Sequence, residues 1–136
     1  MDLNEEIRRW ETSQELYQAA DGALRQQRYR ACVGLAYYAC FQAMWVALGD
    51  PPLGEWRHVG ITRRFCHAQW ADPPLIPTSL ATLHKRLLAL YELRLDVHYR
   101  AQPIHPQQAW QALGTVAEVR RLAQQHKRKR SEEEGL

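Results

Sequence analysis

Arg94 and His98 are the residues of this sequence best suited to chemistry. They are the last two residues of a single helical face, whose successive members lie 3, 4, 4, 3 and 4 positions apart: Leu80, Leu83, Leu87, Tyr91, Arg94 and His98. A guanidinium holds a phosphate with its fixed fork of donors, and an imidazole acts as a general acid or base near neutral pH. Without a metal, such a pair is sufficient for attack of a ribose 2′-hydroxyl on the adjacent phosphodiester.

The same pair also has a structural interpretation. A guanidinium and an imidazole on an inward face cost free energy unless they are paired, or unless that end of the helix opens into a cleft or a partner. Asp96 and Tyr99 are close enough in the sequence to supply part of this pairing across a dimer. The spacing therefore leaves two hypotheses open: a catalytic site of Arg94, His98 and Tyr99, or a hydrogen-bonded His-Tyr-Arg cluster that only joins helices.

The element around which the chain must be arranged is the stretch from Tyr29 to Leu48. After Arg30 it is apolar or small on every side, with Gln42 its only strongly polar residue, and such a helix must be buried all round. It spans roughly 30 Å, which is also the thickness of a bilayer core. However, its surface is mostly Ala, Cys, Gly and Tyr, and charges interrupt the other apolar stretch: Arg86, Glu92, Arg94 and Asp96. We therefore expect the central helix of a soluble bundle and no membrane span.

Further helices are predicted around this centre. Apolar stripes, a capping residue at Asp2, a turn at Gln26-Gln27, and breaks at glycine and proline place them at residues 4–25, 56–70, 78–100 and 106–125. The 56–70 helix is short, and its side chains expected to face the core are Val59, Phe65, Cys66 and Trp70. The 78–100 helix, capped by Thr78 or Ser79, is apolar over most of its circumference and is expected to be a second central helix. Because no segment shows strand-like alternation, the predicted fold is all-α: an antiparallel, up-and-down bundle of four to five helices.

Length and composition fit one domain of a cytoplasmic protein. The 136 residues are 46% hydrophobic and 24% charged, which is ordinary globular usage. Cys32, Cys40 and Cys66 are odd in number and two of them lie in the central helix, so we expect reduced thiols in the cytoplasm. The N-terminus opens with acidic residues and an amphipathic pattern, which does not resemble a secretory signal. We expect a single domain over residues 1–125.

A charged segment at residues 126–136 follows this domain. Lys127 to Arg130 is basic and Glu132 to Glu134 is acidic, within a mild net charge of +3. Such a run at a terminus is usually a solvated, disordered tail, and the alternative is an arm that contacts phosphates.

A second basic region combines charges with an aromatic ring on the 56–70 helix: Trp56, Arg57, His58, Arg63 and Arg64. This patch can stack on and neutralise single-stranded RNA, and the alternative is a solvated helix face with one anchoring tryptophan. No cysteine or histidine pair has the spacing of a zinc site, and no glycine-rich phosphate loop occurs. The sequence therefore predicts no metal and no cofactor.

Three groups of segments resemble the signature of HEPN (higher eukaryote and prokaryote nucleotide-binding) domains. They are Ala19-Ala20 with Gln27 to Ala31, the run Ala36-Tyr37-Tyr38-Ala39-Cys40-Phe41, and Leu90 to Arg94 followed by His98-Tyr99; the similarity continues in His58 to Phe65 and in His105 to Ala109. The similarity covers about residues 10–123. It implies an antiparallel bundle of four to five helices that forms a symmetric homodimer. Such proteins are often encoded beside a minimal nucleotidyltransferase, and many act as metal-independent ribonucleases in toxin–antitoxin pairs.

Two details of the resemblance bear on catalysis. Catalytic HEPN members have four to six residues between the Arg and the His, whereas Arg94 and His98 have three between them. In the subgroup with the pattern LR…DY, an Asp stands at the position of His98, and that subgroup generally lacks the ribonuclease pair. Arg100 and His105 have the four-residue spacing, but Pro103 between them predicts a loop.

The leading hypothesis is a homodimer that acts on or with RNA or nucleotides alongside a nucleotidyltransferase-like protein. An active form would be a metal-independent endoribonuclease. The competing hypothesis is a non-catalytic interaction or nucleotide-binding module with a degenerate ribonuclease site. Homodimerisation is also expected from the residues, because three amphipathic helices scarcely cover two apolar ones and leave an apolar patch.

Overall fold

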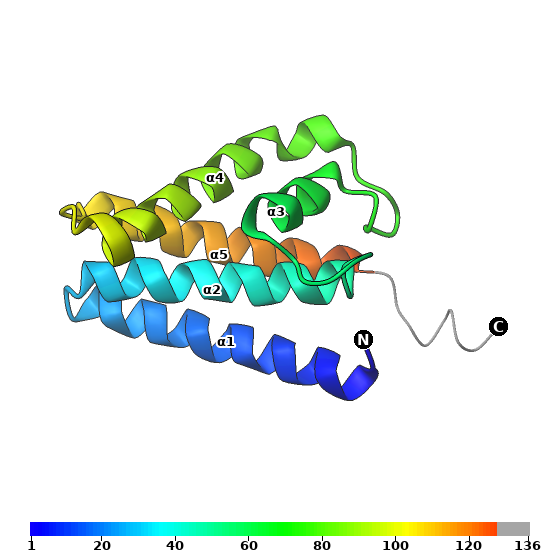
Figure 1. Cartoon of the computed structure of the whole chain (residues 1–136), viewed down its shortest axis with the longest axis horizontal. Coiled ribbons are helices and arrows are strands. Elements are labelled where there is room, and N and C mark those ends of the chain that lie inside the picture. The colour runs from blue at the N-terminus through cyan, green and yellow to red at the C-terminus, as the bar shows by residue number, and fades with distance from the viewer. Residues whose placement is uncertain (128–136) are drawn as a thin grey trace.

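Helices form the regular structure in the part of the chain that the computed structural model describes, residues 1–127 (Figure 1). The elements are α1 (Leu3–Arg25), α2 (Tyr29–Leu48), α3 (His58–His67), the 3-10 turn η1 (Pro77–Leu80), α4 (Ala81–Leu95), the π-helical turn η2 (Asp96–Arg100) and α5 (Pro106–His126). No strand occurs within the described residues, and an isolated bridge joins Ala71 to Lys127. The predicted all-α class is confirmed. The tail predicted at residues 126–136 lies, from residue 128 on, outside the described residues.

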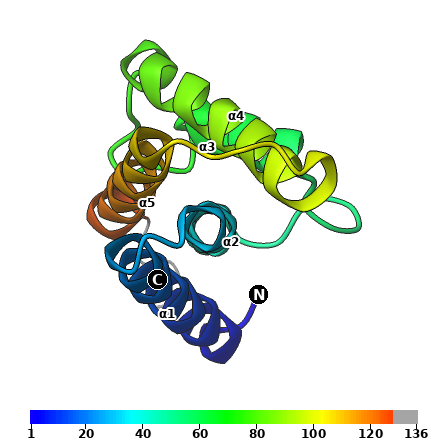
Figure 2. The ribbon, with the colours of Figure 1, turned by 90° about the vertical axis from the view of Figure 1, so that its left-hand side faces the viewer.

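α2 lies at the centre of the bundle, with α1, α4 and α5 around it (Figure 2). Its small buried residues let these neighbours approach closely; they include Cys32, Ala36, Ala39, Cys40, Ala43 and Ala47. α1 and α4 run in one direction, and α2 and α5 run in the opposite one (Figure 1). By length and composition α2 could cross a membrane, but the core helix of a soluble protein meets the same criterion. Of an 18-residue stretch of α2, 61% is buried inside the fold. The predicted central helix is confirmed.

The turn between α1 and α2 is closed by a Schellman motif. Gln27 has a left-handed φ of 61°, and its N–H donates to Leu24 O at 3.0 Å. The N–H of Arg28 donates to Ala23 O at 2.8 Å. Bonds of this pattern satisfy the last carbonyls of a helix and reverse the chain within a few residues. The turn therefore lies where the sequence predicts it, and α1 and α2 pack as an antiparallel pair.

α3 is shorter than predicted, and of the side chains predicted to face inward Phe65 and Cys66 are buried in it. It covers His58–His67 rather than residues 56–70, and its buried residues are Ile61, Thr62, Phe65 and Cys66. Val59 is 57% exposed, so its predicted inward position is wrong. Ala68 takes a left-handed φ of 65° and ends the helix before Trp70. The prediction failed because a helix of 10 residues has too few apolar positions to fix which face is turned inward.

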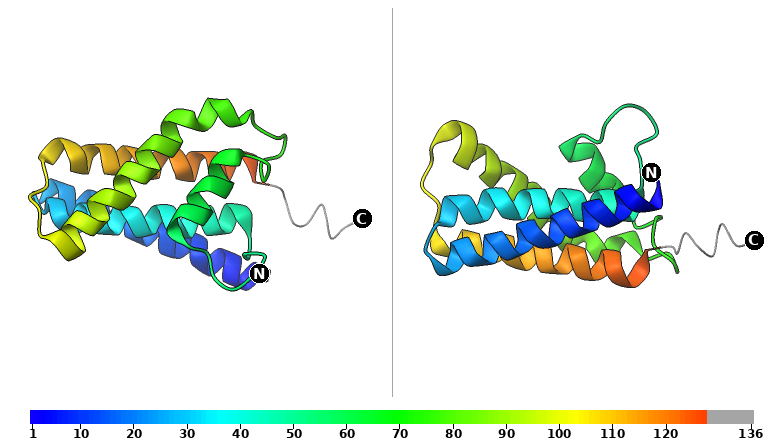
Figure 3. Two further views of the ribbon diagram at one scale, coloured as in Figure 1. Left: turned by 45° about the horizontal axis from the view of Figure 1, so that its top comes forward. Right: turned by 90° about the horizontal axis from the view of Figure 1, so that it is seen from below.

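α4 is not a second central helix, contrary to the prediction. It crosses α2 and α5 obliquely on the outside of the bundle (Figure 3), and its buried residues are Leu83, Leu87, Leu90 and Arg94. Leu88 is 38% exposed. The turn η1 precedes α4, so neither Thr78 nor Ser79 caps it with a side chain. An oblique crossing covers only part of a helix, which explains why an apolar circumference is not buried all round.

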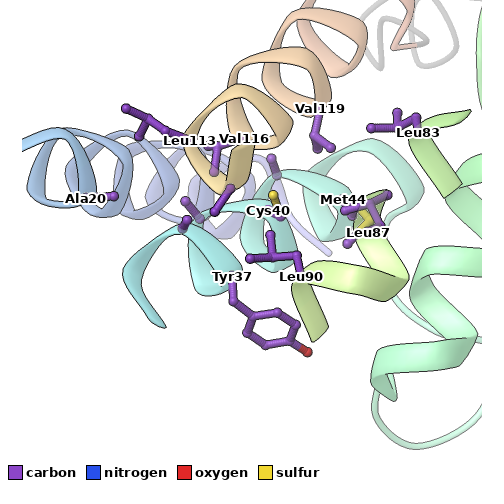
Figure 4. Close-up of a cluster of buried hydrophobic side chains, with 14 of the residues drawn as sticks. Ala20, Tyr37, Cys40, Met44, Leu83, Leu87, Leu90, Leu113, Val116 and Val119 are labelled. Carbon is purple, nitrogen blue, oxygen red and sulfur yellow. The ribbon is translucent and has the colours of Figure 1, made fainter. Parts of the chain in front are cut away.

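α5 completes the core as predicted. Pro106 occupies its first turn, and its inward stripe is buried: Ala109, Ala112, Leu113, Val116, Val119 and Ala123. Side chains of α1, α2, α4 and α5 meet in one cluster, shown in Figure 4 by Ala20, Cys40, Met44, Leu83, Leu87, Leu90, Leu113, Val116 and Val119. Tyr37 lies at the edge of this cluster and points its hydroxyl away from the aliphatic side chains (Figure 4).

Candidate functional site

Arg94, in the last turn of α4, is the one charged residue among residues 1–127 that is buried, with 7% of its surface exposed. Its guanidinium carbon lies 4.8 Å from the ring centre of Tyr37, 5.6 Å from that of Tyr38 and 5.9 Å from that of Tyr91. At these distances an aromatic face attracts a cation, and removal from water strengthens the attraction. Two rings come from α2 and one from α4, so the arginine is held where α4 crosses α2.

No carboxylate in the described part of the chain neutralises this guanidinium. The acids nearest to it in α4 and η2, Glu92 and Asp96, both bind Arg100, at 3.2 and 3.1 Å. Arg94 Nε is enclosed and has no hydrogen-bond partner among residues 1–127. Its two terminal nitrogens make no hydrogen bond to a described residue either. Unlike Nε they are not enclosed, so this end of the guanidinium reaches the surface. A charge held in this way favours an anion as its partner.

His58, the first residue of α3, packs against two of the same tyrosines, Tyr37 and Tyr91. Its ring is stacked on Tyr91, with 5.1 Å between the ring centres and 25° between the planes, and it lies 5.1 Å from the ring of Tyr37. Burial, and secondly the positive charge of Arg94, lower the pKa of His58 below its ordinary value. The imidazole is therefore neutral at pH 7, with one nitrogen that donates a hydrogen bond and one that accepts.

The enclosed side-chain polar atoms without a hydrogen-bond partner in residues 1–127 all lie in this place: Tyr37 Oη, His58 Nδ1 and Arg94 Nε. Buried polar atoms are normally paired, because leaving one unpaired costs about 1–3 kcal/mol. Three such atoms beside one cation mark a position where water or a ligand supplies the missing partners. We call Arg94, His58, Tyr37, Tyr38 and Tyr91 the Arg94 cluster.

The π turn η2 separates His98 and Tyr99 from Arg94. Within it, the N–H of Ala101 donates to Asp96 O, an i to i+5 bond that makes the turn wider than an α-helical one. No residue of η2 is buried. The predicted inward position is therefore right for Arg94 and wrong for His98, because the wide turn at the end of α4 exposes the histidine.

His98 nevertheless lies against the same helix as Arg94. Its Nε2 would be 3.1 Å from a Cβ placed on Gly34, so the glycine at this position of α2 leaves room for the imidazole. Gly34 stands one helical turn before Tyr37, the ring closest to the Arg94 guanidinium. Tyr99 is 74% exposed. The structure thus brings Arg94 and His98 to adjoining turns of α2, one enclosed and the other open to solvent.

Arg100 and His105, the pair with the four-residue spacing, both have structural roles. Arg100 Nη1 donates to the carboxylates of Glu92 and Asp96. His105 caps α5, and its backbone N–H donates to Gln108 Oε1 at 2.8 Å. The loop predicted between them is confirmed, since no helix covers residues 101–105.

Other reactive groups in the described part of the chain are few. Within residues 1–127, no group of three or more His, Cys, Asp or Glu side chains could hold a metal ion. Burial raises the pKa of Cys32 to about 11 and that of Cys66 to about 12, and it also raises the pKa of Cys40. Buried neutral thiols of this kind are poor nucleophiles. The Arg94 cluster is therefore the candidate site.

Of this cluster the sequence predicts Arg94 alone as a site residue: His58 is predicted in the basic patch, and the three tyrosines are not predicted at the site. The neighbours of His58, Trp56 and Arg57, favour a solvent-facing basic patch. A partial signal lies in the central helix, where Tyr37 and Phe41 are one turn apart and both face the His58 ring, at 5.1 and 5.6 Å. Two aromatic residues on a helix of small residues predict that something packs on them, but the spacing does not say what.

No protein-family model matches this chain, and no curated protein matches it. The HEPN resemblance therefore rests on the short motifs alone.

Proposed function

We propose that this protein binds the phosphate of RNA or of a nucleotide at the Arg94 cluster, as a homodimer of the HEPN type with a nucleotidyltransferase-like protein as its partner. The observation that carries this proposal is the buried guanidinium of Arg94, which has no carboxylate partner within residues 1–127. The planar fork of an arginine matches two oxygens of a phosphate. Tyr38, 42% exposed beside the guanidinium, offers a ring on which a base can stack.

The unpaired atoms around Arg94 also suit a phosphate. A phosphate has several acceptor oxygens, so one such group can take hydrogen bonds from a guanidinium, a tyrosine hydroxyl and an imidazole N–H together. Tyr37 and His58 carry the latter two groups beside the guanidinium, and the lowered pKa of His58 keeps its imidazole uncharged at pH 7, so it adds no repulsion. A lone metal cation is disfavoured here by the charge of Arg94.

The first test measures binding of a labelled single-stranded RNA in EDTA by fluorescence anisotropy. Arg94→Gln should weaken binding at least ~10-fold, because a charge-assisted hydrogen bond is worth about 1.5–3 kcal/mol. Arg86→Gln is the matched control, since Arg86 is on the same helix and 57% exposed. Equal affinity of the Arg94→Gln variant and the native protein would refute phosphate binding at this cluster.

The homodimer is supported by large apolar side chains left exposed on α4, η2 and α5. Leu88, Tyr99 and Trp110 are 38%, 74% and 64% exposed. Isologous pairing is a common way to bury exposed apolar side chains of this kind. Sedimentation should give a dimer at micromolar concentration, and a stable monomer would contradict this part of the proposal.

A second candidate function is metal-independent RNA cleavage, which the position of His98 favours. His98 lies on η2, where it is open to solvent and rests against Gly34 of α2, one turn before the rings that hold Arg94. In this reaction His98 takes the proton of a ribose 2′-hydroxyl, whose oxygen then attacks the adjacent phosphorus. The bond from phosphorus to the 5′-oxygen breaks, that oxygen takes a proton from water, and a 2′,3′-cyclic phosphate remains; protonated His98 returns its proton to the hydroxide so formed. Arg94 stabilises the charge on the phosphoryl oxygens.

Cleavage is tested with purified protein and a generic RNA in EDTA. His98→Ala should remove at least ~10² of the cleavage rate, the usual contribution of a general acid or base. His84→Ala, on α4, is the control and should leave the rate unchanged. If the native protein cleaves no RNA while Arg94 remains necessary for binding, the non-catalytic function is the correct one.

A further inference from the structure

A hollow of about 690 Å³ lies between α3 and the loops on either side of it. This volume falls within the range of ligand pockets, about 300–1,000 Å³. Its lining includes Trp56, Trp70, Arg63, Arg64 and His67. We call it the α3 hollow. None of these residues belongs to the Arg94 cluster.

The charge of the α3 hollow is positive. Arg63 and Arg64 are exposed, and neither side chain has an ion pair or hydrogen bond with another described residue. His67 adds a third basic group in the last turn of α3. The acidic residue in the lining, Asp50, accepts a hydrogen bond from Trp45 Nε1 at 3.3 Å. Two arginines against one acid attract an anionic ligand.

The two tryptophans give the α3 hollow fixed aromatic surfaces. Trp56 Nε1 donates to Gly49 O at 2.8 Å, and Trp70 Nε1 donates to Phe65 O at 2.7 Å. The Trp70 ring also stacks on Phe65, with 4.8 Å between centres and 20° between planes. Because both indole N–H groups are already bonded, what the rings present to the hollow is carbon surface. Rigid aromatic surface beside arginines is how proteins hold an unpaired base and its phosphate.

α3 connects this hollow to the Arg94 cluster. His58 begins the helix and belongs to the cluster, whereas Arg63, Arg64 and His67 occupy its second half. At about 1.5 Å per residue the helix is roughly 15 Å long, a distance that a few nucleotides of a single strand cover. A strand whose phosphate lies at Arg94 can therefore reach the hollow along α3.

We propose that the α3 hollow binds an unpaired nucleotide of the same RNA strand whose phosphate Arg94 holds, with the base against the tryptophan rings and the phosphates on Arg63 and Arg64. This inference rests on the proposed function of the Arg94 cluster. The ligand is single-stranded because a base inside a duplex has no free face to stack on a side chain.

The test compares the double variant Arg63→Gln, Arg64→Gln with the control Arg25→Gln, Arg121→Gln, which makes the same charge change on α1 and α5. The probe is a labelled single-stranded RNA of about ten nucleotides, within the usual site sizes of such proteins. The α3 variant should bind it at least ~10-fold more weakly, and the slope of log K against log salt should fall by about 1.4, or 0.7 for each lost phosphate contact. The control should change the affinity less than about threefold.

Two further probes distinguish the kind of ligand. A duplex of the same length should bind the native protein more weakly than the single strand, and equal binding would overturn stacking in the hollow. Free AMP should bind far more weakly than the RNA. If AMP binds as tightly as the RNA and the Arg63→Gln, Arg64→Gln variant loses that binding, the hollow is a mononucleotide site and the RNA proposal is overturned.

Comparison with Arg94→Gln separates this inference from the function on which it rests. If Arg94→Gln weakens binding and the α3 variant behaves as its control does, the inference is wrong and the proposed function stands. If the α3 variant weakens binding and Arg94→Gln does not, the hollow binds RNA and the Arg94 cluster is not the phosphate site. Loss in both variants, with native circular dichroism, is the expected result.

Discussion

Arg120 and Arg94 both lie over aromatic rings, the first between α1 and α5 and the second between α2 and α4, and they differ in what else they bind. Arg120 lies 4.0 Å from the ring centre of Trp10. Its terminal nitrogens donate to Ser13 Oγ at 2.6 Å and to Gln14 Oε1 at 2.7 Å. The Arg94 guanidinium lies over aromatic rings and makes no hydrogen bond to any of residues 1–127.

This difference shows what each arginine does for the protein. A polar group that is hydrogen-bonded to a neighbouring element joins the two elements and fixes their positions. A buried polar group with unused donors lowers stability, and it persists where a ligand or water completes it. We therefore interpret the Arg120 region as architecture and the Arg94 cluster as a binding site.

The largest expected effect is on stability, when each arginine is replaced by methionine. Arg120→Met should lower the free energy of unfolding by about 1–3 kcal/mol, because Ser13 and Gln14 lose a bonded partner. Arg94→Met should leave it within about 1 kcal/mol of the native value or raise it, because an apolar side chain replaces a buried, unpaired charge. Urea unfolding measures both. If Arg94→Met is the more destabilised variant, the interpretation of Arg120 as structural and Arg94 as a binding residue is wrong.

A smaller effect is expected when the bonded serine is removed. Ser13 is fully buried, and its hydroxyl donates to Ala39 O at 2.8 Å as well as accepting from Arg120. Ser13→Ala should cost about 1–2 kcal/mol of unfolding free energy. Thr12→Ala is the control, since Thr12 is exposed and its hydroxyl bonds only within its own helix. A cost no larger than that of the control would show that the Arg120 region is not a structural joint.

Gly34 and Gly114, two of the helical glycines, test the position of His98. Nothing lies within 4 Å of a Cβ on Gly114, so Gly114→Ala should raise the unfolding free energy by about 0.5–1 kcal/mol through helix propensity. Gly34→Ala should gain less, because its Cβ would lie 3.1 Å from His98 Nε2 and displace the imidazole. Thermal unfolding of both variants checks the difference. Equal gains would mean that His98 does not rest against α2.

The smallest expected effect is on the pH dependence of stability. The folded protein holds the pKa of His58 below its ordinary value, mainly by burial and secondly through Arg94. As pH falls through about 6.5, the unfolded chain takes up a proton before the folded one does, so stability is lost. Arg94→Met should raise the His58 pKa partway and reduce this loss, because burial remains. NMR titration of His58 measures the shift, and an unchanged pKa in the variant would contradict the contact with Arg94.

The elements that the sequence predicts well are those fixed by local composition. The apolar circumference of residues 29–48, the inward stripe of α5 and the polar break at Gln26-Gln27 each depend on neighbouring residues only. Arg94 is found for the same reason, because a cation at the end of a leucine stripe is visible in the spacing.

What the sequence does not predict depends on how distant segments pack. The position of His58 follows from the way in which residues 49–57 return α3 to α2 and α4, and no spacing in the chain encodes that return. The exposed face of α4 follows from its oblique crossing, and the inward side chains of α3 from too short a helix. The unpaired state of Arg94 is likewise invisible in the sequence, since Glu92 and Asp96 look like its partners until Arg100 is seen to bind both.

The π turn has a consequence for how the length of this chain can change. A turn closed by the bond from Ala101 N–H to Asp96 O contains one residue more than an α-helical turn, so the loss of one residue there can be absorbed by closing it to α geometry. The loss of one residue within α4 before Arg94 would instead rotate the arginine by about 100° away from the rings of Tyr37 and Tyr38. A deletion of one residue should therefore be tolerated within η2, after the arginine, and not within α4 before it.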